Sequence, residues 1–237
     1  MLTCIVLFGG RGSRFRYSKP KQYFEISGKS LMAYCLNSLK VIKQLHQLVI
    51  VCEPTERERV QKIVSEMRPF SNQLEIDYCD SGLQRSDSVL NGLKMCKSTT
   101  KYVLIHDGAR AFCPQTLLTE LTDNLLTYKG GVVPGLPIVD TIVRIDDHNQ
   151  NTISQRLDRN ELRRVQTPQG FEYPLILKAY LQGKDNNFEG TDCSSYFLNI
   201  GYEVRVIEGS EENVKITTPT DIEIAKNILR SRNALGC

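Results

Sequence analysis

Short, almost continuously apolar runs alternate with longer segments of helical period through the first half of the chain. The apolar runs predict strands, and they lie at residues 3–8, 47–52, 74–79 and 102–106. The segments between them predict helices, at residues 30–42, 54–67, 86–97 and 114–128. This alternation is typical of a parallel sheet, and strands that are apolar throughout are those covered on both faces. We therefore predict an α/β fold with a Rossmann-like, mostly parallel sheet and helices on both faces.

The alternation is interrupted between residues 140 and 168. A β-rich run at 141–145 is followed by a polar stretch and then by an arginine-dense one, which predicts an excursion from the main body. The αβ pattern then returns with helices at 174–181, 192–200 and 219–230 and a strand at 203–207. Since no linker rich in Gly, Pro or Ser divides the chain, we predict a single domain over residues 1–237, with the segment 140–168 inserted in it.

Charge and cysteine usage limit the partners and the compartment. Thirty basic and 27 acidic residues give a net charge of +3, too small to mark a dedicated nucleic-acid or membrane binder. The first apolar run precedes the positive charges, which is the wrong order for a signal peptide, and no run reaches the length of a membrane span. The eight cysteines contain no CxxC pair, which favours buried thiols in a reducing compartment. We expect a cytoplasmic protein without nucleic-acid or membrane partners.

A glycine-rich, basic loop follows the first predicted strand. It reads Gly9-Gly10-Arg11-Gly12-Ser13-Arg14, and residues 11–21 hold five basic side chains and no acidic one. Glycines let backbone amides approach an anion closely, and the carboxyl edge of an α/β sheet is where such folds bind ligands. The spacing fits neither a Walker loop nor a dinucleotide fingerprint. We predict a triphosphate site of another kind, and a solvated basic turn is the alternative.

Asp107 and Arg110 follow the strand at residues 102–106. Asp107 is expected to reach the same crevice as the glycine loop, where one carboxylate with substrate phosphates would suit Mg²⁺. In the alternative interpretation Asp107 is a turn former and Arg110 its surface partner.

Three further segments are weaker signals. The loop from residue 80 to 88 includes Gly82 and Ser88 and offers amides and hydroxyls of the kind that read a base edge, although Ser86 is expected to cap the following helix. Lys215 is flanked by apolar residues, so it faces either a pocket or solvent. The arginines of residues 155–164 fit a solvated face, and the segment 166–169 (QTPQ) is too polar for a core strand.

Taken in order, these segments resemble the 2-C-methyl-D-erythritol 4-phosphate cytidylyltransferases. The resemblance covers almost the whole chain, and its motifs are GGRGSR with PKQY, SGLQRSDSVLNGL, HDGAR, PIVDTI, LDRNEL with QTPQGF, GTDCSS and NVKITTPTDIEIA. It implies a nucleotidyltransferase-type fold whose excursion is a dimerisation arm, and therefore a homodimer. It also implies CTP and methylerythritol phosphate as substrates, with Mg²⁺ as cofactor.

The resemblance also implies the residue roles. Nucleotide binding falls to Gly9, Gly10, Arg11, Gly12, Ser13, Arg14, Lys21, Gly82 and Ser88. The residues implied to bind the second substrate are Asp107, Arg110, Thr141, Arg159, Thr191 and Lys215. Arg159 would reach it from the other subunit, and Asp107 would also bind the metal. The substrate phosphate would attack the α-phosphorus in line, with Arg14, Lys21 and Lys215 as the catalytic charges and no protein nucleophile.

The sequence departs from the pattern of this family at three positions. Phe8-Gly9 stands in place of Ala-Ala, Ala111 replaces a proline and Cys193 replaces a residue that is commonly acidic. Ribitol phosphate cytidylyltransferases share the glycine loop, PKQ and QTPQ, and so remain an alternative. A regulatory module that binds nucleotide without catalysis is another, although a sensor would not need the charges of Lys21, Asp107 and Lys215.

Overall fold

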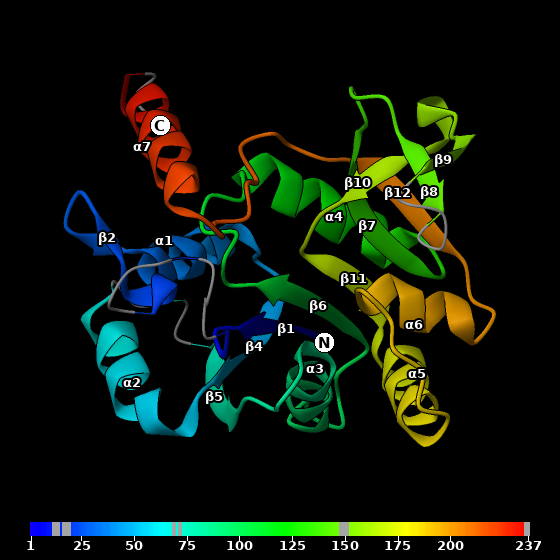
Figure 1. The fold of residues 1–237 in the computed structure, drawn as a ribbon. Helices are drawn as coiled ribbons and strands as arrows, with labels where there is room; N and C mark the ends of the chain where they lie inside the picture. The colour runs from blue at the N-terminus through cyan, green and yellow to red at the C-terminus, as the bar shows by residue number, and fades with distance from the viewer. Residues whose placement is uncertain (11–14, 16–19, 68–69, 71–72, 147–151, 235–237) are drawn as a thin grey trace.

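A computed structural model describes residues 1–10, 15, 20–67, 70, 73–146 and 152–234. Its centre is an eight-stranded sheet with the order β10-β7-β11-β6-β1-β4-β5, and β12 pairs with β7 beside this path (Figure 1). The strands are β1 (Leu2–Leu7), β4 (Leu45–Cys52), β5 (Glu75–Asp80), β6 (Tyr102–Asp107), β7 (Gly131–Pro137), β10 (Arg163–Val165), β11 (Gln169–Glu172) and β12 (Val204–Glu208). The predicted α/β class is confirmed.

The pairing is parallel in one half of the sheet and mixed in the other. Strand β1 pairs in parallel with β4 and β6, and β4 pairs in parallel with β5. Strands β10 and β11 run antiparallel to their neighbours, whereas β12 is parallel to β7. The sheet is therefore mostly parallel, with its antiparallel strands all in the half that follows β6.

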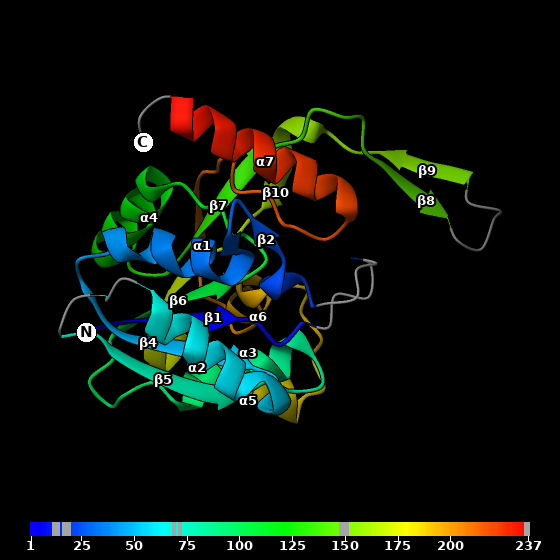
Figure 2. The same ribbon diagram turned by 90° about the vertical axis from the view of Figure 1, so that its left-hand side faces the viewer.

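Helices cover both faces, as the apolar strands predict. They are α1 (Leu31–Ser38), α2 (Arg57–Glu66), α3 (Arg85–Lys94), α4 (Gln115–Thr127), α5 (Tyr173–Asp185), α6 (Cys193–Asn199) and α7 (Pro219–Ala234). Buried side chains of α1, α2, α4 and α7 form one core cluster with Cys4 and Val6 of β1. Those of α3, α5 and α6 form the other with Ile5, because successive strand residues face opposite sides (Figure 2). No helix in the described part of the chain is long and apolar enough to cross a membrane.

Strands β7 and β11 were absent from the sequence prediction, and both lie in the middle of the sheet. Two prolines and two glycines interrupt β7, which hides it from a search for β-rich runs. The prediction that residues 166–169 are too polar for a core strand holds for 166–168, which lie between β10 and β11, but it is wrong for Gln169, which begins β11 and is 1% exposed. Its side-chain amide donates to Asp192 (2.7 Å) and its oxygen accepts from the Cys193 amide (3.1 Å), so its polar atoms are satisfied inside the protein.

The predicted excursion is a separate two-stranded hairpin. It consists of β8 (Val143–Asp146) and β9 (Thr152–Arg156), which pair only with each other among the described strands and extend away from the sheet (Figure 2). The chain returns to the main sheet at β10, so the last residues of the segment 140–168 belong to the body. The extent of a single domain over residues 1–237 stays a prediction.

Candidate active site

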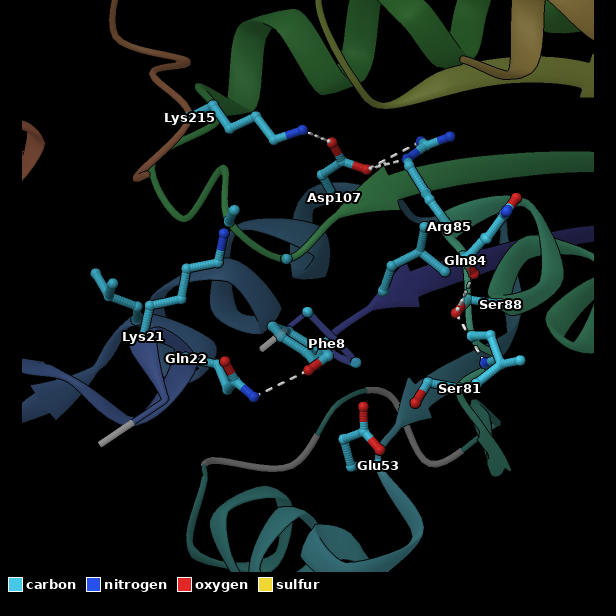
Figure 3. A pocket seen from close by; sticks show the side chains of 18 of the residues that line it. Phe8, Lys21, Gln22, Glu53, Ser81, Gln84, Arg85, Ser88, Asp107 and Lys215 are labelled. Atoms are coloured by element: carbon cyan, nitrogen blue, oxygen red, sulfur yellow. Dashed lines mark hydrogen bonds and ion pairs between the residues drawn. The ribbon is translucent and has the colours of Figure 1, made fainter. Parts of the chain in front are cut away.

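Three strand ends converge on one cavity at the carboxyl edge of the sheet. Phe8 and Gly9 follow β1, Ser81 and Gly82 follow β5, and Asp107 ends β6. Because these strands are parallel, their carboxyl ends meet at one edge, and the cavity between them measures about 690 Å³ (Figure 3). Gly10, Lys21, Ser88 and Lys215 also line it. The expectation that the glycine loop and Asp107 share a crevice is confirmed for Gly9 and Gly10, the described residues of that loop.

Asp107 is held between two cations. Its Oδ1 accepts from Nε of Arg85 at 3.0 Å, and its Oδ2 accepts from Nζ of Lys215 at 2.7 Å. Burial by itself would raise the pKa of Asp107, but the charges of Arg85 and Lys215 outweigh it and hold this pKa well below its usual range. Asp107 is therefore ionised near neutral pH. Its backbone oxygen does accept from the Arg110 amide in a turn, at 2.9 Å, but its side chain is buried and pairs with Arg85 and Lys215, so the alternative of a surface pair with Arg110 is wrong.

The predicted nucleotide-facing glycines have close neighbours. A Cβ at Gly9 would lie 2.2 Å from Cβ of Ser81, and one at Gly82 would lie 2.1 Å from Cβ of Asp87. The amide of Gly82 donates to the Ser88 hydroxyl at 3.0 Å, which ties the loop to α3. Only glycine fits at these two positions with the surroundings as they stand. Glycine at position 9, where the family usually has alanine, is therefore explained by the close approach of Ser81.

Lys21 and Lys215 lie at the same wall of the cavity. Lys21 begins the short 3-10 helix Lys21–Tyr23, and its Nζ donates to the backbone oxygen of Ile216, next to Lys215, at 3.3 Å. The neighbouring Gln22 is buried and donates to the Phe8 oxygen at 3.0 Å, which fixes this helix to the end of β1. The predicted residues Arg11, Gly12, Ser13 and Arg14 lie outside the described residues.

A second cavity of about 470 Å³ adjoins the first and is rich in cations. It shares Arg85, Asp107 and Lys215 with the first cavity. Arg110, Arg163 and Thr191 line only the second, and Arg110 Nη1 donates to the Asn213 oxygen at 2.6 Å. Burial lowers the pKa of Arg110, although nearby Asp107 acts in the opposite direction. The two cavities thus meet at a group of one carboxylate and two cations, which we call the shared charge group.

Buried polar residues behind the shared charge group were not identified from the sequence. The hydroxyl of Thr167 accepts from the Asp107 amide at 3.0 Å and contacts Nδ1 of His106 at 3.2 Å. Burial lowers the pKa of His106 to about 4, so this ring is neutral near pH 7. Arg85 was missed because it reads as one more surface arginine in a polar loop. The strand end fixes Asp107, but only the fold brings α3 beside it.

Thr141 and Arg159 do not join the other predicted residues. They line a third cavity, of about 610 Å³, made entirely from residues of the excursion and sharing no lining residue with the first two. Nη1 of Arg159 donates to the backbone oxygen of Val139. Within one chain, Thr141 and Arg159 therefore lie in a cavity separate from the two that contain the other predicted residues.

The carboxylates offer little that would hold a metal by themselves. Among the described residues, no group of three or more His, Cys, Asp or Glu side chains is gathered around one point. Asp107 and Glu53 are the acidic residues that line the first cavity. A single carboxylate with phosphate oxygens is nevertheless a donor set that Mg²⁺ accepts, and Lys215, with a side chain 43% exposed, has room to release Oδ2 of Asp107. The residues therefore fit a metal that arrives with a phosphorylated ligand.

Comparison with known proteins agrees with this geometry. The sequence pattern of the 2-C-methyl-D-erythritol 4-phosphate cytidylyltransferase family matches residues 2–231. Two relatives of that name, from Clostridioides difficile and Geobacillus kaustophilus, are 35% and 37% identical; alignments cover 97% of this chain and 94% and 97% of theirs. The crystal structure of 4-diphosphocytidyl-2C-methyl-D-erythritol synthase from Anaerococcus prevotii superposes with a TM-score of 0.84 at 26% identity, covering 97% of this chain and 96% of that one. This chain belongs to the 2-C-methyl-D-erythritol 4-phosphate cytidylyltransferase family.

Proposed function

We propose that this protein joins CTP and 2-C-methyl-D-erythritol 4-phosphate to give 4-diphosphocytidyl-2-C-methyl-D-erythritol and pyrophosphate, in isoprenoid precursor biosynthesis. The observation that carries the proposal is the meeting of two cavities at the shared charge group. A transferase of this class must bring two phosphorylated substrates together at one point, and cations are needed where their negative charges meet.

The first cavity takes the nucleotide. Gly9, Gly82 and Ser88 line this cavity and face the cytosine, and the two glycines keep the wall compact because their missing side chains let Ser81 and Asp87 approach closely. Gly10, at which a Cβ would meet no neighbour among the described residues, leaves room for phosphate. Lys21 binds the triphosphate, together with Arg11, Gly12, Ser13 and Arg14 of the same loop.

The second cavity takes methylerythritol phosphate. Arg110 and Lys215 attract the phosphate, the Thr191 hydroxyl donates to or accepts from the alditol, and the Asp107 carboxylate accepts hydrogen bonds from the alditol hydroxyls. Four cationic side chains line this cavity against two carboxylates, Asp107 and Asp192, so its surplus of positive charge suits a dianion.

The reaction is a single displacement at phosphorus. An oxygen of the methylerythritol phosphate attacks the α-phosphorus of CTP, the new P–O bond forms, and the bond to the β-phosphate oxygen breaks with departure of pyrophosphate. Lys21, Lys215 and Arg14 stabilise the negative charge that accumulates on the oxygens, and they need no proton transfer to do so.

Mg²⁺ accompanies the nucleotide in this proposal. Asp107 would hold it together with phosphate oxygens, and the ion would supply positive charge at the triphosphate. Lys215 then turns from Asp107 toward phosphate, which its half-exposed position allows.

The excursion forms the dimer interface in this proposal, so that Thr141 and Arg159 complete the second cavity of the partner copy. The support is their separation from the second cavity of their own chain, together with the exposed apolar side chains of Ile145 and Ile153 on the hairpin, 48% and 68% exposed. Deleting residues 140–162 should give a monomer with little activity, and a deletion variant that remained dimeric in sedimentation would contradict the proposal.

The seven described cysteines are free thiols, which supports a cytoplasmic location.

Pyrophosphate release tests the function directly. The purified protein is mixed with CTP, Mg²⁺ and either methylerythritol phosphate or ribitol 5-phosphate, and release is expected only with the first. Release with ribitol 5-phosphate alone would change the substrate, whereas nucleotide binding without release in either mixture would favour a regulatory module.

A further inference from the structure

Arg85 is the member of the shared charge group that also contacts buried residues of α5 and α6. It is the first residue of α3, because Gln84 caps the helix and Asp87 accepts from the Gln84 amide at 3.0 Å; the expectation that Ser86 caps this helix is wrong. From this position the side chain reaches the end of β6, where Figure 3 shows it facing Asp107 opposite Lys215. Its side chain is 31% exposed and lines both cavities.

On one side, the guanidinium competes with Lys215 for Asp107. Nε and Nη2 of Arg85 lie 3.0 and 2.9 Å from Oδ1, and Nζ of Lys215 lies 2.7 Å from Oδ2. One negative charge is thus divided between two positive ones. Without Arg85, the carboxylate would pair with Lys215 alone, and the ammonium would be drawn more tightly to Asp107 and neutralised by it.

On the other side, the guanidinium meets neutral groups. Nη1 of Arg85 donates to Sγ of Cys193 at 3.6 Å, and that sulfur also accepts from the Tyr180 hydroxyl at 3.2 Å. Burial raises the pKa of the Cys193 thiol and holds that of Tyr180 well above its usual value, so neither group carries charge near neutral pH. The ring of Tyr180 is itself stacked on Tyr196 with centroids 4.1 Å apart. These contacts fix the guanidinium without neutralising it.

We propose that Arg85 is a positioning residue for the transfer reaction, which acts through Asp107 by sharing its charge and so leaves the Lys215 ammonium available to substrate phosphate. This inference rests on the proposed function. Lys215 stands where the two cavities meet, and a displaced catalytic group costs up to about 10² in rate. Arg85 should therefore affect turnover more than the binding of either substrate.

The first experiment measures kcat and both KM values by pyrophosphate release. Arg85→Met is expected to lower kcat by about 10- to 100-fold while each KM changes by less than about threefold. Arg85→Lys should recover part of the loss, because it keeps a cation for Asp107. The matched control is Arg57→Met, which removes an arginine that pairs with Asp80 outside both cavities and should leave kcat unchanged.

A double-mutant cycle separates positioning from direct contact with substrate. If Arg85 acts through Asp107, adding Arg85→Met to Asp107→Asn should lower kcat by no more than about threefold beyond Asp107→Asn alone. The inference would be overturned if the two substitutions lowered kcat by the product of their separate effects. It would also be overturned if Arg85→Met raised KM without lowering kcat, or if Arg85→Lys were no more active than Arg85→Met. The double variant removes both charges together, so it keeps the test open even if Arg85→Met alone folds poorly, as followed by circular dichroism.

The failure of the proposed function looks different. A wild-type protein that releases no pyrophosphate would contradict the transfer reaction itself. An active wild type with an unchanged Arg85→Met variant would overturn only the role of Arg85.

Discussion

The body of this protein and its hairpin excursion both carry cations assigned to substrate, but they hold them differently. In the body, Lys215 is fixed by an ion pair to an aspartate whose side chain is only 10% exposed and which a second cation also holds. On the excursion, Arg159 contacts a backbone oxygen, and every residue of the neighbouring strand β9 is exposed. The body can therefore preorganise its charges alone, whereas the excursion obtains a fixed environment only when another surface covers it.

Replacing Lys21 tests the preorganised side of this comparison and should have the largest effect. Lys21→Ala is expected to lower kcat by about 10² to 10³ in pyrophosphate release, because one fixed charge is lost where negative charge develops. Lys21→Arg should rescue poorly, since a planar guanidinium does not replace a point charge. The matched control is Lys29→Ala, which removes a lysine on β3 (Lys29–Ser30) that lines none of the three cavities. Near-normal kcat in Lys21→Ala would mean that this lysine only attracts nucleotide.

Replacing Arg159 tests the excursion. Arg159→Ala is expected to raise KM for methylerythritol phosphate by roughly tenfold to more than a hundredfold, with little change in KM for CTP, because charge-assisted hydrogen bonds of about 1.5 to 3 kcal/mol to one substrate are lost. Arg144→Ala, on β8 of the same hairpin, is the control and should leave both constants unchanged. Equal impairment of both constants would indicate that Arg159 only stabilises the arm.

Mixing two impaired variants, at a methylerythritol phosphate concentration too low for Arg159→Ala to turn over, sharpens the same point. A heterodimer of Arg159→Ala with Lys21→Ala should regain one intact site, because the Lys21→Ala chain supplies Arg159 to the site that still holds Lys21. Absence of activity in a confirmed heterodimer would show that the two residues serve the same chain's site.

Replacing Asp107 measures how much the body depends on its buried charge. Asp107→Asn should lower the free energy of unfolding at pH 7 by about 1 to 3 kcal/mol, because Arg85 and Lys215 lose their partner. The pKa of Asp107 is depressed in the folded state, so this stabilisation is present above the usual Asp pKa of about 3.9 and is lost as the pH falls below it toward the folded value. Urea unfolding of both proteins at pH 7 and at pH 3 should therefore show a smaller difference at pH 3.

The surface pair Arg57 and Asp80 supplies the control for the unfolding free energies of Asp107→Asn. Asp80→Asn should cost less than about 1 kcal/mol, because Asp80 is exposed and Arg57 half-buried, so solvent screens the pair. The Mg²⁺ concentration that gives the highest activity should also be higher for Asp107→Asn than for the wild type. An unchanged Mg²⁺ optimum would mean that Asp107 pairs with Arg85 and Lys215 but does not bind the metal.

The smallest effect is expected at the hairpin. Ile153→Ser should raise the dimer dissociation constant by about fivefold, since part of an exposed apolar side chain no longer becomes buried on association. The melting temperature of the monomer should not move. Sedimentation velocity over a dilution series measures this, with Thr152→Ala as control. An unaltered dimer dissociation constant would mean that Ile153 does not lie in the interface.

The sequence predicts the parallel half of this fold well because β1, β4 and β6 are apolar runs and a helix follows each of its strands along the chain. It fails at β7, where prolines and glycines stand in a central strand, and at β11, where the buried Gln169 side chain bonds to Asp192 and Cys193, more than twenty residues away in the sequence. The same division holds for the site. Gly9, Lys21 and Asp107 follow strands and could be identified, whereas the role of Arg85 depends on contacts between α3, β6 and α6 that no local pattern contains.

The place of β11 between β6 and β7 also sets the order in which the protein can be completed during translation. Strands β5, β4, β1 and β6 are neighbours in the sheet and all lie within the first 107 residues, so they can pair as soon as that part of the chain leaves the ribosome. Strand β7 cannot take its place until β11 follows some thirty residues later, about the length of the intervening excursion. Lys215 is synthesised later still, so a nascent chain can build the strand-end wall of the first cavity while Arg85 is the one cation of the shared charge group beside Asp107. A chain stalled before Lys215 would thus hold two of the three proposed catalytic charges and lack the one at the junction of the cavities.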